Sequence, residues 1–278
     1  MNNFYKILPG KFHIPSAEPN ITEDDAKAAY NAIKEGRLSS GSYVKKFEQE
    51  FANYIGTKFA IAVNSATSGL QLSLASLGIY DGEVITTPFT YAATSNVIVH
   101  QNAKPVFVDV DKTTYNIDPD KIEKAITKKT RAIMPIHYGG QCSEMEEISE
   151  IASKHNLFVI EDAAPAIGAT HKQRRAGTFG IISAFSFFPD KNLTTGEGGM
   201  VVTSDPELAD KCEELRKNGA SSRYHHTSIG WNFKMPDPNA ALGLSQLKRI
   251  ESVIATKNKI AKYYQVSLEK INEIQPPI

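Results

Sequence analysis

The sequence predicts an α/β fold in which helices flank a mostly parallel central sheet. Short apolar runs rich in Val, Ile and Phe recur along the chain, and amphipathic segments of helical length lie between them. Strands that are joined through helices in this way run parallel to one another. The expected strands are residues 59–63, 83–86, 105–109, 131–136, 157–160, 181–188 and 200–203.

Composition narrows the class of protein. The 278 residues can bury a large core and leave room for a small second domain, and 31 basic residues balance 31 acidic ones. This balance argues against a general attraction to nucleic acid or to an anionic membrane. With only Cys142 and Cys212 as cysteines, no apolar run of bilayer length and no signal-peptide pattern at residues 1–4, the expected compartment is the cytoplasm.

Two helices are expected near the N-terminus. Thr22 is a suitable N-cap for the first helix and Gly36 a suitable stop, whereas Ser42 and Gly56 have these roles in the second. The polar segment 38–41 between them is interpreted as a surface loop, with contact to a substrate as the alternative.

The turn at residues 64–69 joins the first strand to a helix expected at 70–77. Free N–H groups at a helix N-terminus attract anions, and the hydroxyls of Thr67 and Ser68 add hydrogen-bond donors. The turn is therefore a candidate phosphate site. Ordinary helix capping by Ser65 and Thr67 explains the same residues and stays open as the alternative.

The remaining helices alternate with the later strands and then dominate the C-terminal part. Thr256 is expected to cap the last helix, which is rich in lysine and therefore solvated on most of its surface. The expected helices are residues 91–99, 119–126, 144–154, 207–218, 239–253 and 256–272.

Three chemically versatile side chains follow strand ends. In a parallel sheet, ligands bind at the carboxyl ends of the strands, so Tyr91, Asp162 and Lys191 are expected on one rim. Asp162 follows a buried strand directly. Its carboxylate is either a local cap or the ion-pair partner of a bound cation.

The segment 186–199 is the most informative part of the sequence. The strand at 181–188 must end near Pro189, which cannot continue a central ladder, and three glycines then lead into the strand at 200–203. Lys191 is thereby held between two strands. A positioned, partly desolvated lysine amine is what attack on an aldehyde or ketone requires, although a solvated loop lysine is the ordinary alternative.

Other catalytic motifs are absent from the sequence. There is no Gly-x-Gly-x-x-Gly after the first strand and no Walker phosphate loop. A Ser-x-x-Lys nucleophile motif is also excluded, because Ser186 lies five residues from Lys191 and that motif needs three. His137, His225 and His226 lack the spacing of a metal cluster and are expected at the surface or near substrate. No metal site is predicted.

Taken together, the motifs resemble the DegT-type sugar aminotransferases, a branch of the fold-type I enzymes that use pyridoxal 5′-phosphate (PLP). The resemblance covers nearly the whole chain and is most specific at 186–199. The matching segments are Gly36 with Gly41, and residues 64–70, 88–94, 161–164, 186–199, 230–235 and 240–243.

The resemblance implies a role for several of these residues. Lys191 would hold PLP covalently and then move the proton, Asp162 would pair with the pyridine nitrogen, and Tyr91 would stack on the ring. The remaining cofactor contacts would bind the phosphate, and Asn232 among them would come from the other subunit of a homodimer. These contacts are Ala66, Thr67, Ser186 and Asn232.

The activity implied is transfer of an amino group from an amino acid, usually glutamate, to a keto group of a nucleotide-linked sugar. Family members that perform sugar dehydration carry histidine in place of the lysine, so Lys191 favours transamination. A non-catalytic relative that binds PLP or a sugar nucleotide, and another PLP reaction on the same scaffold, stay open as alternatives.

The sequence departs from the family pattern in two places. Pro165 stands where members commonly carry Gln or His, and proline can neither donate a hydrogen bond nor titrate. The family also continues beyond residue 278 into a small domain, so the chain is either shortened or naturally short, with the cofactor site expected to be complete and the substrate site left open. The expected domains are a PLP-binding large domain at 1–235 and the start of the small domain at 236–278.

Overall fold

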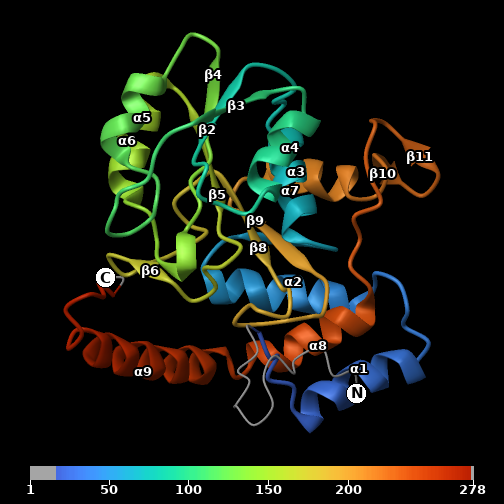
Figure 1. The fold of residues 1–278 in the computed structure, drawn as a ribbon. Coiled ribbons are helices and arrows are strands. Elements are labelled where there is room, and N and C mark those ends of the chain that lie inside the picture. Colours follow the sequence, from blue (N-terminus) through green and yellow to red (C-terminus); the bar gives the residue numbers. More distant parts are fainter. Residues whose placement is uncertain (1–16, 277–278) are drawn as a thin grey trace, which may run out of the picture.

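A seven-stranded sheet forms the centre of the computed structural model, which describes residues 17–276 (Figure 1). The strand order is β1-β9-β8-β5-β4-β2-β3. The strands are β1 (Phe59–Val63), β2 (Glu83–Thr86), β3 (Lys104–Phe107), β4 (Thr130–Ile133), β5 (Phe158–Asp162), β8 (Ile182–Ser186) and β9 (Gly199–Thr203). Within this sheet β9 is antiparallel to both of its neighbours and the other pairs are parallel. The predicted α/β fold with a mostly parallel sheet is confirmed.

Helices cover both faces of this sheet (Figure 1). One face packs against α3, α4 and α7, while the other packs against α2 and α8 at the β1 end and α5 and α6 at the β3 end. The helices are α1 (Glu23–Lys34), α2 (Ser42–Ile55), α3 (Ala66–Ser76), α4 (Ala93–His100), α5 (Pro119–Ala125), α6 (Met145–His155), α7 (Pro206–Leu215), α8 (Asp237–Leu247) and α9 (Ile250–Leu268). Because successive residues of a strand face opposite layers, both faces of the inner strands are buried, as at β8 and β9, whose residues are all buried.

Most helix ends follow the predicted caps, but the start of α2 does not. Thr22 caps α1 in a capping box, and Gly56 ends α2 in the left-handed conformation, as expected. The N-cap of α2 is Gly41 rather than Ser42. The carboxylate of Asp237 accepts the N–H groups of Gly41 and Val44 at 2.9 and 3.0 Å, so a residue 196 positions away supplies the missing cap.

The C-terminal helices divide at a different place from the one predicted. The break lies between α8 and α9 at residues 248–249, and Thr256 lies inside α9, where its hydroxyl donates to the Ser252 carbonyl. The prediction of Thr256 as a cap is therefore wrong. Beyond Ile250, α9 has no buried residue, as its lysine-rich sequence indicated. The predicted domain boundary at 235/236 stays a prediction.

Two small hairpins were not expected from the sequence. They are formed by β6 (Thr170–His171) with β7 (Arg174–Arg175) and by β10 (Ala220–Ser222) with β11 (His225–His226). Lys172 and Gln173 turn the first hairpin with φ of 47° and 69°, a conformation usually signalled by Asn or Gly. None of the helices within residues 17–276 is both long and apolar enough to cross a membrane. Residues 1–4, which entered the compartment prediction, lie outside the described residues.

Candidate active site

A cavity of about 440 Å³ lies at the carboxyl ends of the central strands. The start of α3, the loops after β2 and β4, the end of β5 and the β8–β9 loop all contribute to its lining. Six of the seven predicted site residues line it. They are Ala66, Thr67, Tyr91, Asp162, Ser186 and Lys191. Asn232 is not part of the lining and pairs through its backbone with Lys217.

Lys191 is held by the loop between β8 and β9. Its N–H donates to the Phe188 carbonyl at 3.0 Å, and the buried side chains of Phe187 and Leu193 anchor the loop on either side. The amine Nζ lies 3.1 Å from a carboxylate oxygen of Asp190, and 23% of the Lys191 side chain is exposed. The amine is thus fixed at the cavity rather than free in solvent.

Asp162 is the last residue of β5, not a residue that follows the strand as the sequence indicated. Its side chain is 3% exposed. One carboxylate oxygen accepts from the Thr94 hydroxyl at 2.7 Å and the other from the Ala164 N–H at 3.2 Å. Burial raises the pKa of Asp162 above its ordinary value of 3.8, and these two hydrogen bonds only partly offset the effect.

Thr94 is a residue of this site that sequence reasoning missed. It is 1% exposed, and its hydroxyl lies between Asp162 and the Thr90 hydroxyl, which is 2.7 Å away. The available signal was its position three residues after Tyr91 in the helix predicted at 91–99, because residues at that spacing share a helix face. In the structure that helix begins only at Ala93. α4 therefore brings the Thr94 hydroxyl to the end of β5.

Glu161 lies beside Asp162 in the sequence but in a different environment. It is 0% exposed and accepts five hydrogen bonds. Burial alone would raise the pKa of Glu161, but the hydrogen bonds, led by that from His137, hold it below its ordinary value of 4.5. The five donors are His137 Nε2, Ser183 Oγ and the N–H groups of Gly177, Phe179 and Gly180.

His137 corrects the expectation of a surface or substrate-contacting histidine. It is fully buried, with Nε2 2.9 Å from Glu161. Its Nδ1 accepts the Ser143 N–H at 3.2 Å, so the ring proton resides on Nε2 and is donated to Glu161. Its role here is to join the β4–α6 loop to β5. Within residues 17–276, no three His, Cys, Asp or Glu side chains are grouped to hold a metal ion.

The N-terminus of α3 opens into the cavity. Ser65 caps the helix by accepting the Ser68 N–H, and the Ser68 hydroxyl donates to Asn64 at 2.6 Å. The capping interpretation of Ser65 is thus confirmed, and the Ser68 hydroxyl is used inside the turn rather than offered to a ligand. The first N–H groups of a helix, here those of Ala66 and Thr67, have no partner within it.

Gly199 allows this helix end to approach the sheet closely. A Cβ atom at this position would lie 2.6 Å from the Ser65 carbonyl carbon and 2.7 Å from the Ala66 nitrogen. These contacts are with backbone, which cannot move aside as a flexible side chain can. A larger residue would push the N-terminus of α3 away from the cavity.

The other lining residues differ in exposure. Tyr91 is 81% exposed, whereas Ser186 is 7% exposed and its hydroxyl accepts the Phe188 N–H at 3.3 Å. Pro165, the departure from the family pattern, also lines the cavity. It presents a ring without a donor where the family commonly places one.

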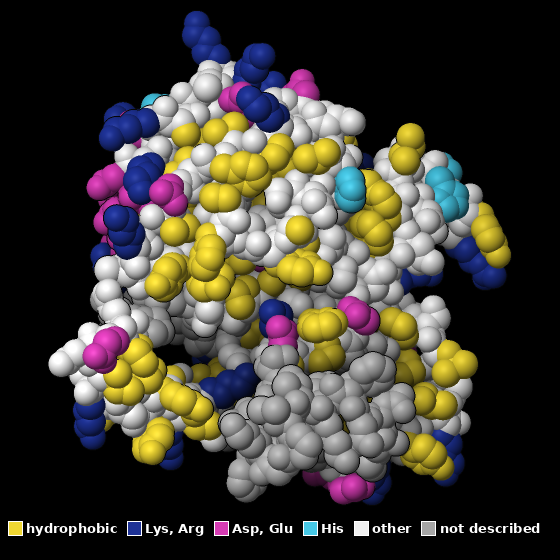
Figure 2. Space-filling model, in the orientation of Figure 1, with side chains coloured by type: hydrophobic (Ala, Val, Ile, Leu, Met, Phe, Trp, Pro, Cys, Tyr) yellow, Lys and Arg dark blue, Asp and Glu magenta, His cyan; other side chains and the backbone are white. Residues whose placement is uncertain are grey.

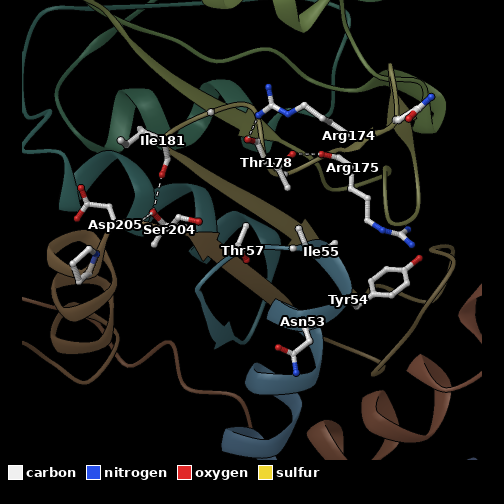
Figure 3. Close-up of a pocket in the computed structure, with 16 residues that line it drawn as sticks. Asn53, Tyr54, Ile55, Thr57, Arg174, Arg175, Thr178, Ile181, Ser204 and Asp205 are labelled. Atoms are coloured by element: carbon white, nitrogen blue, oxygen red, sulfur yellow. Dashed lines mark hydrogen bonds between the residues drawn. The ribbon is translucent and has the colours of Figure 1, made fainter.

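A second and larger cavity, of about 920 Å³, lies between the end of α2, the β6–β7 hairpin and the start of α7. Figure 3 shows Arg175 reaching toward Tyr54, with its guanidinium 4.3 Å from the centre of the ring. No predicted site residue lines this cavity. Size alone therefore does not identify the site, and the smaller cavity is the candidate because Lys191 and Asp162 both line it.

Comparison with known proteins agrees with this geometry. The chain is 43% identical over 269 residues to GDP-perosamine synthase of Caulobacter vibrioides, covering 95% of this chain and 72% of the relative. It is also 43% identical over 277 residues to the spore coat polysaccharide biosynthesis protein SpsC of Bacillus subtilis, covering 95% of this chain and 71% of that protein.

Solved structures are similar in the same way. An aminotransferase from Psychrobacter cryohalolentis superimposes with a TM-score of 0.91 at 37% identity, over 94% of this chain and 71% of that one. Helicobacter pylori PseC, an aminotransferase involved in the biosynthesis of pseudoaminic acid, superimposes with a TM-score of 0.88 at 33% identity. The match covers 93% of this chain and 71% of that one. Residues 19–278 match a single family model. The chain belongs to the DegT/DnrJ/EryC1/StrS aminotransferase family.

Proposed function

We propose that this protein uses PLP to transfer an amino group from an amino acid, with L-glutamate as the expected donor, to a keto group of a nucleotide-linked sugar. The observation that carries the proposal is that Lys191 and Asp162 line one cavity. Relatives named GDP-perosamine synthase and UDP-4-amino-4,6-dideoxy-N-acetyl-beta-L-altrosamine transaminase, at 43% and 38% identity, support the choice of acceptor.

The residues present fit this cofactor. Asp162 is a buried carboxylate with a raised pKa and two hydrogen bonds, so a cation beside it would stabilise its charged form. A protonated pyridine nitrogen is such a cation. At the other end, a phosphate dianion suits the N–H groups of Ala66 and Thr67 at the start of α3, with the Ser186 hydroxyl close to the same cavity.

Lys191 is proposed to hold the cofactor and to move the reacting proton. When bound, PLP supplies an aldehyde carbon and a ring that withdraws electrons from the amino-acid Cα. Nζ would hold the cofactor at its aldehyde carbon and would serve as the base and acid for the proton that moves between the amino-acid Cα and that carbon. Asp162 would keep the ring nitrogen protonated, and Tyr91 would cover the ring.

We extend the proposal to a homodimer in which Asn232 of a second copy reaches the phosphate. Asn232 does not line its own chain's cavity, and it follows the β10–β11 hairpin. Tyr224 in the turn of that hairpin is 85% exposed, and Ile229, which follows the hairpin, is 92% exposed. Large apolar side chains that project in this way favour coverage by a partner. We place the reaction in the cytoplasm, in keeping with two buried cysteines that form no disulfide.

The first experiment records the visible absorbance spectrum of the protein with PLP, before and after L-glutamate, for wild type and for Lys191→Ala. Wild type should show the band of lysine-bound cofactor and lose it with glutamate, because the amino group passes to the cofactor. Lys191→Ala should form no covalent adduct. Lys257→Ala is the matched control, because this lysine donates to Asn192 beside the same loop but does not line the cavity.

The second step supplies a nucleotide-linked keto sugar to the glutamate-treated protein and identifies the product by mass spectrometry. An amino sugar supports transamination, whereas loss of water would identify a dehydratase. Unchanged spectra of wild type with glutamate would reject the proposed donor, and failure of PLP to bind would reject the assignment of Lys191 and Asp162.

A further inference from the structure

Three aromatic side chains form a cluster at the mouth of the cofactor cavity. We name Phe89, Tyr115 and Tyr138 the rim cluster. Their ring centres lie 4.6 Å (Phe89–Tyr138), 5.6 Å (Phe89–Tyr115) and 6.3 Å (Tyr115–Tyr138) apart. Each side chain is about 40% exposed, and Tyr138 also lines the cavity. In the same order, the rings are tilted by 42°, 36° and 58° to one another, so each presents its own flat face to solvent beside the proposed site.

The backbone of Tyr115 is strained to place its ring there. Its φ is 59°, a conformation that is uncommon for bulky residues. The preceding turn holds it, because a carboxylate oxygen of Asp111 accepts the N–H groups of Thr113 and Thr114, both at 2.9 Å. Strain that surrounding structure maintains at the edge of a site suggests a function.

A buried asparagine joins Tyr115 to Tyr138. Asn116 is 3% exposed, and its side-chain oxygen accepts the Tyr138 N–H at 2.8 Å. Its amide donates to the carbonyls of Gln141 and Cys142 at 3.1 and 3.2 Å. The loops after β3 and β4 are therefore fastened together, so that the two rings keep their relative position without ligand.

We propose that the rim cluster stacks against the nucleobase of the nucleotide-linked substrate. This inference rests on the proposed function and adds to it the part of the protein that recognises the nucleotide. Stacking needs only a flat ring, and every base has one, so a single platform accepts purines and pyrimidines. Figure 2 shows hydrophobic side chains exposed on one face of the molecule among charged ones. The hydroxyls of Tyr115 and Tyr138 allow the rim cluster to remain exposed when it binds no base.

The test measures binding of UDP and of GDP to the PLP-loaded protein by calorimetry. Phe89→Leu and Tyr138→Leu keep apolar bulk but remove the flat ring. Each should lower the affinity for both nucleotides by about five- to 100-fold. Tyr80→Leu is the matched control, since Tyr80 is a half-exposed tyrosine that precedes β2, whereas Phe89 follows that strand at its other end. It should leave both affinities unchanged.

A third variant separates stacking from structural support. Tyr115→Asn removes the ring but suits a positive φ, so its thermal midpoint should match or exceed that of wild type while nucleotide affinity falls. Equal nucleotide affinity in all the rim variants would overturn the inference and leave the proposed function intact.

Two other results are distinguishable. If wild type binds neither UDP nor GDP, the nucleotide-linked acceptor and the inference both fail. If the rim variants instead change the molecular mass measured by light scattering while nucleotide affinity stays constant, a second copy of the chain covers the cluster and the inference is wrong.

Discussion

Glu161 and Asp162 are neighbours in β5 and equally buried, yet their pKa values shift in opposite directions. Five hydrogen bonds hold the pKa of Glu161 down against the effect of burial. Asp162 accepts two, and burial raises its pKa. The number of donors, rather than depth, separates a carboxylate that supports the fold from one that can take part in chemistry.

Alternation along the strand produces this difference. Consecutive side chains face opposite sides of a sheet, so Glu161 meets the N–H groups of the loop at 177–180 and Asp162 meets α4 and the cavity. A buried carboxylate with few donors is costly unless a cation accompanies it. The fold therefore leaves at Asp162 a place where the binding of a cation is favourable.

The largest effect is expected from Asp162→Asn. The amide cannot stabilise a protonated ring nitrogen, so the rate of the glutamate half-reaction should fall by about 100-fold or more. The cofactor-free protein should become more stable, because burial disfavours the charged form of Asp162 and the substitution removes that charge. Stopped-flow absorbance and urea unfolding measure the two quantities.

Asp205→Asn provides the control for that substitution. Asp205 caps α7, and asparagine caps helices equally well. Both quantities should stay at their wild-type values in this variant. An Asp162→Asn protein that reacts with glutamate at the wild-type rate would break the comparison, because Asp162 would then have no chemical role.

Glu161→Gln tests the other member of the pair. The amide nitrogen cannot accept from the N–H groups around it, so several buried donors lose their partner and the protein should lose about 3 kcal/mol of unfolding free energy. Glu83→Gln should cost less than 1 kcal/mol, because Glu83 accepts from Thr127 and pairs only with the exposed Lys104. Equal losses in the two variants, measured by urea unfolding, would contradict the structural role of Glu161.

The sequence could predict the positions of Lys191 and Asp162 because strand ends of a parallel sheet meet at one edge. Both residues follow apolar runs whose length and composition define the strands. The roles of their neighbours could not be predicted in this way. His137 and Glu161 lie 24 residues apart and meet only because β4 and β5 pair in the sheet.

Other features were missed for the same physical reason. The cap of α2 comes from Asp237, and no local pattern connects residues about 200 positions apart. The hairpin turn at Lys172 and Gln173 has positive φ without the glycine or asparagine that would announce it. Local propensity predicts the elements, whereas tertiary contacts decide which polar groups are satisfied.

Thr94→Val should produce a smaller effect than the substitution of Asp162 itself. It removes one of two donors, so the pKa of Asp162 should rise further and the glutamate half-reaction should slow by about tenfold. Thr86→Val is the matched control, since the buried Thr86 hydroxyl donates to the Met134 carbonyl away from Asp162. If both variants slowed the reaction equally, the Thr94 hydrogen bond would have no specific role.

The smallest effect is the pH dependence of stability, and it has opposite signs at the two carboxylates. A lowered folded-state pKa means that Glu161 stabilises the fold above pH 4.5 and that this contribution is lost as the pH falls below that value. A raised folded-state pKa means that Asp162 favours the fold below pH 3.8 and that this contribution is lost as the pH rises through the folded-state value.

Urea unfolding of the cofactor-free proteins from roughly pH 7 down to pH 3 measures this difference. At neutral pH the free energy of unfolding of Glu161→Gln should be lower than that of wild type, and that of Asp162→Asn should be higher. Both curves should approach the wild-type curve on acidification, because protonation removes from wild type the charge that each variant lacks. Curves that stay parallel to wild type would show that neither carboxylate changes its pKa on folding, and the contrast between the two residues would then be one of hydrogen bonding alone.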